Sequence, residues 1–182
     1  IIDLSNDFRL NKENSKSKLN FIYGLPEFQK DKISKAKYIA NPGCFATAIQ
    51  LSLLPLAKNN LIKNHIHTSA TTGSTGAGAS LSDTKHFSWR NNNLSWYKPF
   101  VHQHLWEIKQ TLSSLIKNKF EIIFLPHRGN FTRGIFSTSY LNYRGSLESA
   151  NELYDDYYKN DPFTHISKNE LSLKNVVNSN NC

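Results

Sequence analysis

The sequence changes from strand to helix at Asn41-Pro42-Gly43-Cys44-Phe45-Ala46-Thr47. The Pro-Gly pair in this segment favours a sharp turn. Before the turn, Tyr38–Ala40 is predicted as a short strand. After the turn, apolar residues recur at helical spacing over residues 45–60, and Pro55 is expected to kink this helix or end it early. The segment therefore places a cysteine in the first turn of a predicted helix.

A cysteine in this position is a candidate nucleophile. Unpaired backbone N–H groups and the helix dipole favour a thiolate at a helix N-terminus, so we expect the thiol pKa of Cys44 to lie below its usual value of ~8.5. The thiolate is the form that attacks carbonyl carbon. From the local sequence alone, a buried and inert cysteine is an equally good interpretation of Cys44.

The rest of the chain mixes strand and helix patterns without strict alternation. We therefore expect an α+β fold in a single substrate/catalytic domain over residues 1–182, with a mixed, largely antiparallel sheet and helices on one face. Gly145-Ser146 is a helix-start signal. The predicted strands are 1–5, 65–70, 121–125, 134–143 and 176–177, and the further predicted helices are 105–116 and 147–157.

Composition sets broad limits on function. The chain has 182 residues, 22 Lys or Arg against 14 Asp or Glu, and a net charge of +8. A lysine-rich solvated surface and an anionic ligand both remain open as explanations of this charge. No nucleic-acid-binding motif, membrane span or signal peptide is evident, and because the chain does not begin with Met we expect an upstream portion to be missing. Two widely spaced cysteines favour a reducing, cytoplasmic setting.

A cysteine nucleophile needs a group that handles its proton, and histidine is the usual choice. The pair His102-Gln103-His104 precedes the predicted helix over 105–116. In an extended segment the two side chains point to opposite sides, so only one of them is expected to face Cys44. A capping or surface role remains open for both histidines. No third ligand is nearby, so we expect no metal site.

Two further segments are candidate ligand sites. The loop from Thr72 to Gly78 contains three glycines, which allow close backbone approach to a ligand and let N–H groups converge on an anion. It matches neither a dinucleotide fingerprint nor a P-loop. Arg128 and Arg133 could hold a phosphate or carboxylate. A flexible surface turn and ordinary surface arginines are the alternatives.

Taken together, these segments resemble the N-acetyl-gamma-glutamyl-phosphate reductase family. The matching segments follow the family's order and span nearly the whole chain. Asn-Pro-Gly-Cys with a downstream His-x-His and Arg-Gly-Ile is quite specific to this family. The matches are Ile2–Leu10, Tyr23–Glu27, Ala40–Ala48, Gly73–Gly78, His102-Gln103-His104 with Glu107-Ile108, and Arg133-Gly134-Ile135.

The resemblance implies a fold like the catalytic domain of the glyceraldehyde-3-phosphate dehydrogenase superfamily. It implies NADPH-dependent reduction of N-acetyl-glutamyl 5-phosphate to the semialdehyde through a cysteine thioester, in arginine biosynthesis. It also implies a homo-oligomer built through the sheet. The implied roles are nucleophile for Cys44, acid/base for His102 with His104 in reserve near the substrate, substrate contact for Tyr23 and Arg133, and approach to the nicotinamide for Thr72 and Gly73.

The chain departs from the family pattern in places. Trp106 stands where the family usually has proline. The family's Rossmann cofactor domain and C-terminal helix have no counterpart here, so we expect this chain to be inactive in reduction on its own. The alternatives are a non-catalytic anion-binding or interaction domain of the same fold, or an aspartate-semialdehyde dehydrogenase-like enzyme. Acetyl and succinyl remain equally open as the acyl group on the substrate nitrogen.

Overall fold

The structure is a computed structural model that describes residues 1–14 and 18–182. Its contacts group the chain into two compact units. The first unit comprises Ile1–Leu61 and Gln103–Lys117, and the second comprises Ile62–His102 and Asn118–Cys182. Each unit is described by itself below. That the whole chain acts as a single catalytic domain stays a prediction.

The first unit combines a small parallel sheet with helices. Its three strands pair in the order β1-β3-β2, with Ile2 opposite Ile39 and Phe21 opposite Tyr38. The strand at Tyr38–Ala40 was predicted with these bounds. The elements are β1 (Ile2–Asp3), α1 (Asn11–Asn14), β2 (Phe21–Tyr23), α2 (Pro26–Ile33), β3 (Tyr38–Ala40), α3 (Cys44–Lys58) and α5 (His104–Ser113).

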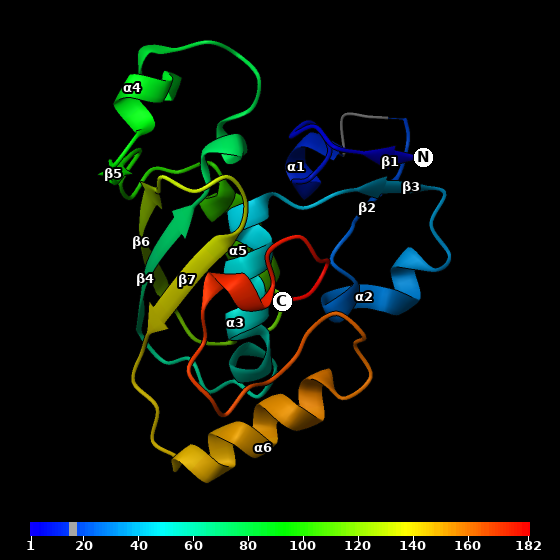
Figure 1. Ribbon diagram of the computed structural model, residues 1–182. Coiled ribbons are helices and arrows are strands. Elements are labelled where there is room, and N and C mark those ends of the chain that lie inside the picture. Colours follow the sequence, from blue (N-terminus) through cyan, green and yellow to red (C-terminus); the bar gives the residue numbers. More distant parts are fainter. Residues whose placement is uncertain (15–17) are drawn as a thin grey trace. The chain divides into compact units, whose positions relative to one another are not determined.

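The core of the first unit lies between α3 and α5, which run side by side (Figure 1). Phe45, Ile49 and Leu53 of α3 are fully or almost fully buried, as their spacing predicted. Ile108 of α5 is fully buried as well. Pro55 was expected to kink the helix or end it early, yet α3 continues to Lys58. The residues before and after Pro55 are buried, and this tertiary packing stabilises the helix beyond the proline.

The second unit is built on a four-stranded mixed sheet of order β5-β6-β4-β7 (Figure 1). β4 pairs parallel to β6 and antiparallel to β7, and β5 pairs antiparallel to β6. The mixed sheet confirms the predicted α+β class, but the prediction of largely antiparallel pairing is wrong: among the described strands three pairings are parallel and two are antiparallel, because β1, β2 and β3 pair in parallel and β4 pairs parallel to β6. Its strands are β4 (His65–Thr72), β5 (Ser95–Trp96), β6 (Glu121–Arg128) and β7 (Ile135–Tyr140).

Side chains alternate across this sheet, so its two faces differ. On one face, Ile66 and Ala70 of β4 and Ile122 and Phe124 of β6 are buried. The opposite face is open, and its residues are half-buried or exposed. We call this opposite face the outer face, and its central members are His67, Ser69, Thr71, Ile123, Leu125, His127, Phe136, Thr138 and Tyr140.

Helix α6 (Leu147–Tyr158) begins where Gly145-Ser146 predicted it. The Ser146 hydroxyl accepts the Ser149 N–H at 3.2 Å and caps the helix. The predicted strand at residues 176–177 is wrong: these residues lie in a turn after a 3₁₀ helix, where no neighbouring strand pairs with them. The short helical elements are η1 (Ser74–Ala77), η2 (Asp83–Lys85), α4 (Phe87–Arg90) and η3 (Leu173–Asn175).

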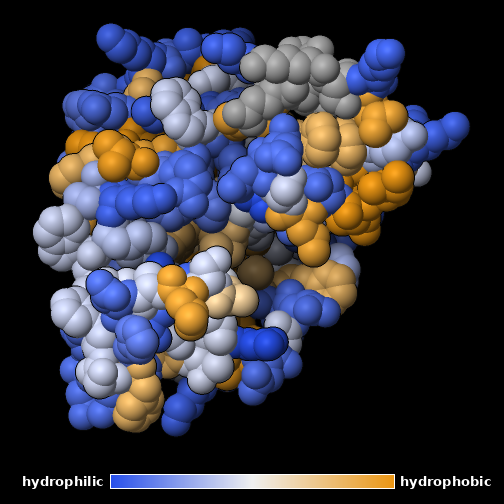
Figure 2. Space-filling view, turned by 90° about the horizontal axis from the view of Figure 1, so that it is seen from above, coloured by the Kyte–Doolittle hydropathy of each residue, from blue (hydrophilic) through white to orange (hydrophobic). Residues whose placement is uncertain are grey.

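The surface carries hydrophobic side chains in separate patches among hydrophilic ones, as the face in Figure 2 shows. Within the described parts of the chain, no helix has the length and apolar character needed to cross a bilayer. Scattered exposed apolar residues are normal on soluble surfaces, so these patches by themselves assign no function.

Candidate active site

Cys44 is the first residue of α3 and is exposed. Gly43 is the N-cap, with an extended backbone at φ −67° and ψ 149°. The sharp Asn41–Gly43 turn follows directly on β3, as the sequence predicted. The thiol therefore projects from a helix N-terminus that is anchored to a sheet.

The thiol pKa of Cys44 is raised, not lowered as we expected from the helix start. Although the residue as a whole is exposed, desolvation by the protein atoms around its sulfur is the largest cause, because it disfavours the charged thiolate. The backbone N–H groups of Phe45 and Cys44 act in the opposite direction, followed by Arg9. Glu107 adds to the increase. Cys44 therefore needs a base to form the thiolate at neutral pH.

A buried carboxylate holds the turn in front of Cys44. Glu107, in the first turn of α5, accepts the Gly43 N–H at Oε2 over 2.9 Å. The same oxygen accepts the Tyr23 hydroxyl at 2.9 Å. The other oxygen, Oε1, lies 3.3 Å from Nη1 of Arg9 in an ion pair. Both side chains of this ion pair are less than one tenth exposed, so water screens it weakly.

Arg9 forms a hydrogen bond with the other end of the same turn. Its Nε donates to the carbonyl oxygen of Asn41 at 2.8 Å. Its Nη1 also donates to Asn6 at 2.6 Å, and its Nη2 donates to the carbonyl of Leu4 at 3.1 Å. Arg9 and Glu107 are thus bound to each other and to opposite ends of the Asn41–Gly43 turn. We call this arrangement the Arg9–Glu107 clamp.

Tyr23 belongs to the same buried network. Its hydroxyl donates to Glu107 and accepts the Gln50 side-chain amide at 2.8 Å. Burial, and then the negative charge of Glu107, raise the pKa of this hydroxyl. The predicted contact between Tyr23 and a substrate stays a prediction, because the hydroxyl is engaged inside the unit.

His104 lies beside both chain neighbours of Cys44. A Cβ added to Gly43 would come within 2.3 Å of His104 Nε2, so the imidazole fills the space that a side chain would take. The ring also meets Phe45 edge-on, with centroids 6.3 Å apart. Burial, assisted by the charge of Arg9, lowers the pKa of His104 to about 4. The imidazole is therefore neutral at physiological pH.

His102 lies in the second unit and is buried. Its ring meets Tyr97 and Phe124 edge-on, each at a centroid distance of 5.6 Å. Within this unit His102 is thus a packed aromatic side chain. Its predicted acid/base role stays a prediction.

The structure brings three other predicted residues together in the second unit. Gly73 follows Thr72 at the end of β4, and a Cβ on Gly73 would come within 2.5 Å of the Thr132 carbonyl oxygen and 2.8 Å of Arg133 N. Only glycine fits this close approach. The Arg133 side chain is exposed. Thr72, Gly73 and Arg133 therefore share one corner of the sheet, while the predicted roles of Arg133 at the substrate and of Thr72 and Gly73 at the nicotinamide stay predictions.

The Gly-rich loop uses its amide groups internally. The N–H of Gly73 donates to the carbonyl of Gly134 at 3.0 Å. The N–H groups of Ser74 and Thr75 donate to the carbonyls of Phe131 and Thr132. These amides are committed to the loop preceding β7, so they do not converge on an anion as the glycine pattern suggested.

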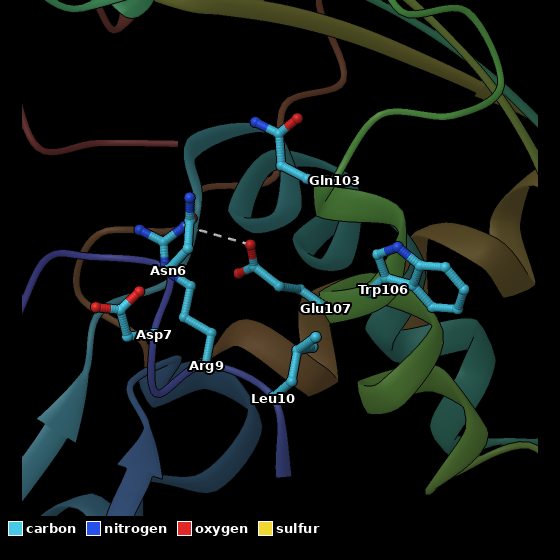
Figure 3. A pocket seen from close by; sticks show the side chains of 7 residues that line it. All are labelled: Asn6, Asp7, Arg9, Leu10, Gln103, Trp106 and Glu107. Atoms are coloured by element: carbon cyan, nitrogen blue, oxygen red, sulfur yellow. Dashed lines mark hydrogen bonds and ion pairs between the residues drawn. The ribbon is translucent and has the colours of Figure 1, made fainter. Parts of the chain in front are cut away.

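A pocket of about 390 Å³ opens beside the clamp (Figure 3). Arg9 and Glu107 extend toward each other across it, and Trp106 stands at its side. Trp106 is 65% exposed. The lining residues are Asn6, Asp7, Arg9, Leu10, Gln103, Trp106 and Glu107.

The described residues contain no group of three or more His, Cys, Asp or Glu side chains that could hold a metal ion. The groups described at this site are the Cys44 thiol, the His104 imidazole and the Arg9–Glu107 clamp.

Sequence reasoning gave no role to Arg9, Glu107 or Gln50. Arg9 and Glu107 lie 98 positions apart, so no local pattern joins them. One signal was available: Glu107 follows His104 by three positions, and His104 directly precedes the predicted helix, so a helix that begins at His104 puts both on one face. A buried acid beside a candidate histidine was therefore accessible to the sequence, whereas its arginine partner was not.

The family model described as semialdehyde dehydrogenase, dimerisation domain, matches residues 44–182. Proteins named N-acetyl-gamma-glutamyl-phosphate reductase match the whole chain. The chain is 56% identical to that of Flavobacterium johnsoniae, 54% to that of Karelsulcia muelleri and 51% to that of Bacteroides thetaiotaomicron. It spans 56% of the length of each of these relatives. The resemblance predicted from the motifs is confirmed.

Solved structures of similar fold are aspartate-semialdehyde dehydrogenases. The enzyme from Francisella tularensis has a TM-score of 0.67 at 14% identity, covering 99% of this chain and 63% of its own. The enzyme from Candida albicans, solved with NADP, has a TM-score of 0.55 at 14% identity, covering 84% and 47%. At such low identity these similarities support the fold alone.

Proposed function

Because this chain belongs to the semialdehyde dehydrogenase dimerisation-domain family, we propose that the protein containing it is an NADPH-dependent N-acyl-gamma-glutamyl-phosphate reductase. Identity of 50–56% over the whole chain to proteins of that name supports the substrate class. The observation that carries the chemistry is Cys44 at the N-terminus of α3 with the His104 ring against Gly43. Arginine biosynthesis is then the pathway of this reaction.

The first stage of the proposed reaction is acyl transfer to Cys44. Neutral His104 accepts the thiol proton as the substrate is attacked; because the pKa of His104 is lowered and that of Cys44 is raised, the thiolate forms only transiently during this attack. The thiolate attacks the γ-acyl carbon, and phosphate leaves as the thioester forms. The backbone N–H groups of Cys44 and Phe45 act on the sulfur and stabilise negative charge there.

The second stage reduces the thioester and releases the product. NADPH, when bound, supplies the hydride. The hemithioacetal on Cys44 then collapses to the semialdehyde, and His104 returns its proton to the sulfur. We assign this proton transfer to His104 because its ring lies beside both neighbours of Cys44. His102, the residue that the motif resemblance favours, stays a prediction for the same role.

For the cofactor, Thr72 and Gly73 stay the proposed approach to the nicotinamide, although both are buried and the Thr132 carbonyl fills the Cβ side of Gly73. The amides of Gly73, Ser74 and Thr75 are bonded internally, so the loop holds no dinucleotide phosphate. We propose that these phosphates bind in a part of the full-length protein outside these 182 residues. Arg133, at the same corner, is proposed to contact the substrate.

The outer face of the second unit is proposed to bind a second copy of the protein. The open face of β4, β6 and β7 includes Phe136 and Tyr140, which are 47% and 64% exposed. The family description names a dimerisation domain, which supports this surface as the contact. The two free cysteines support a cytoplasmic location.

The test of the proposal is substitution of Cys44 in the full-length protein. Cys44→Ser is expected to abolish both NADPH oxidation and phosphate release with N-acetyl-glutamyl 5-phosphate. Cys182→Ser is the matched control and is expected to retain both activities. Full activity of Cys44→Ser contradicts the proposal, and preference for the aspartyl substrate over the glutamyl one contradicts its substrate class.

A further inference from the structure

The Arg9–Glu107 clamp encloses only three residues, and those three immediately precede the proposed nucleophile. Glu107 holds the N–H of Gly43, and Arg9 holds the carbonyl of Asn41. The two side chains are paired with each other at 3.3 Å and are almost fully buried. A structural ion pair placed at random would have no reason to bind both ends of this particular turn.

We infer that Glu107 is a positioning residue of the Cys44 reaction: its carboxylate fixes the Gly43 N–H, and through it the point where α3 begins and the place of the Cys44 sulfur. The inference rests on the proposed function of Cys44. Glu107 itself touches no reacting atom; it acts through the backbone between Gly43 and Cys44.

The bonding of Arg9 supports a positioning role over ligand binding. Three of its nitrogens are engaged, to Asn41, Asn6, Glu107 and Leu4. Most of its N–H groups therefore donate hydrogen bonds inside the first unit and are not available to a ligand. The pairing also neutralises Glu107, whose uncompensated charge beside Cys44 would oppose thiolate formation.

Two substitutions at Glu107 separate position from charge. Glu107→Asp keeps the charge for Arg9 but shortens the side chain by one methylene, so the carboxylate withdraws from the Gly43 N–H. Glu107→Gln keeps the length and an acceptor oxygen for Gly43 but loses the charge. If Glu107 positions Cys44, kcat falls more in Glu107→Asp than in Glu107→Gln. Because Glu107→Gln removes the charge that pairs with Arg9, the free energy of unfolding falls more in Glu107→Gln than in Glu107→Asp.

The measurement is pre-steady-state phosphate release, kcat, KM and thermal unfolding in the full-length protein. We expect Glu107→Asp to lower the phosphate-release rate and kcat by roughly 10–100-fold, with KM changed less than about 3-fold, because misplacement of about an ångström has this effect. Glu107→Gln is expected to lose less activity and more stability. In Glu107→Gln the alkylation pKa of Cys44 is expected to fall, because Glu107 raises it.

Glu121→Asp is the matched control, because Glu121 is an exposed acid on β6 whose side chain is 61% exposed. A folded Glu107→Asp variant with wild-type kcat overturns the inference, and so does activity that simply follows stability across the two variants. If Glu107→Gln does not fold, the kcat of Glu107→Asp alone tests the positioning role. Inactive Cys44→Ser beside fully active Glu107→Asp leaves the proposed function standing and removes only the positioning role.

Discussion

At the scale of single residues, the surroundings of Cys44 decide its reactivity. The helix N-terminus favours the thiolate, but burial of the sulfur outweighs it and raises the thiol pKa. A raised pKa means that the thiolate fraction at pH 7 is smaller than in a free cysteine. Activation of Cys44 therefore depends on a neighbouring base and on the arrival of substrate.

This balance predicts the pH dependence of alkylation. Cys44 in the folded protein is expected to react with iodoacetamide with an apparent pKa above that of the same thiol in urea. The reaction should thus start at higher pH in the folded state, because only the thiolate reacts. The measurement is mass-spectrometric alkylation of the Cys44 peptide across pH. A folded-state pKa below the unfolded one would falsify the dominance of burial.

The two histidines give a second prediction at this scale. His104→Ala in the full-length protein is expected to lower kcat by roughly 10²–10⁴-fold, because His104 lies against the neighbours of Cys44. His102→Ala is expected to lower stability through lost ring packing while affecting kcat less. Steady-state kinetics and thermal unfolding of both variants measure these two effects. The reverse order of kcat losses would return the acid/base role to His102.

At the scale of elements, the start of α3 leaves no room for a side chain at Gly43. The extended backbone conformation of Gly43 is one that any residue can adopt. A larger residue is disfavoured only because its Cβ would collide with the His104 ring. Gly43→Ala is expected to cost about 1–3 kcal/mol of stability through overpacking and to lower kcat by displacing His104. Kinetics and urea unfolding measure both effects.

Gly145→Ala is the control for Gly43→Ala, because the atoms nearest its Cβ would be those of the Tyr143 side chain in the second unit. It is expected to leave kcat unchanged. If Gly43→Ala were as active as Gly145→Ala, the close contact between His104 and the nucleophile turn would have no catalytic meaning.

Long elements with a buried face were predictable from the sequence, and short ones were not. The apolar spacing predicted both ends of α3, α5 and α6 to within three residues, because burial imposes the helical period. Helix α2 was missed because none of its residues is buried, so no periodicity marks it. The two-residue strand β5 exists only through its pairing with β6, which no local pattern encodes.

In the candidate site, likewise, features marked by a local sequence pattern were predictable, and features that depend on tertiary packing were not. The Pro-Gly-Cys turn correctly placed Cys44 at the start of α3 because the signal is local, while its role as nucleophile stays a prediction. The Arg9–Glu107 clamp joins the segment after β1 to α5, and tertiary packing alone brings them together. The choice between His102 and His104 also depended on packing, since the sequence places both beside the same helix.

At the scale of the whole molecule, the outer face predicts the oligomeric state. Leu125 lies at the centre of this face, half-buried beside Ser69. Leu125→Glu is expected to convert the full-length protein from dimer to monomer, because a charge would be buried against the second copy. Asn160→Glu adds the same charge at an exposed position after α6 and should leave the dimer intact. Light scattering after size exclusion distinguishes the two outcomes; a dimeric Leu125→Glu would place the contact elsewhere.

The central claim is that Cys44 carries the acyl group. The most direct measurement is mass spectrometry of the full-length protein quenched in acid after mixing with the acyl phosphate in the absence of NADPH. We expect one N-acylglutamyl group on the Cys44 peptide, removed by hydroxylamine and absent from Cys44→Ser. Phosphate release at the wild-type rate with no adduct on Cys44 would contradict it.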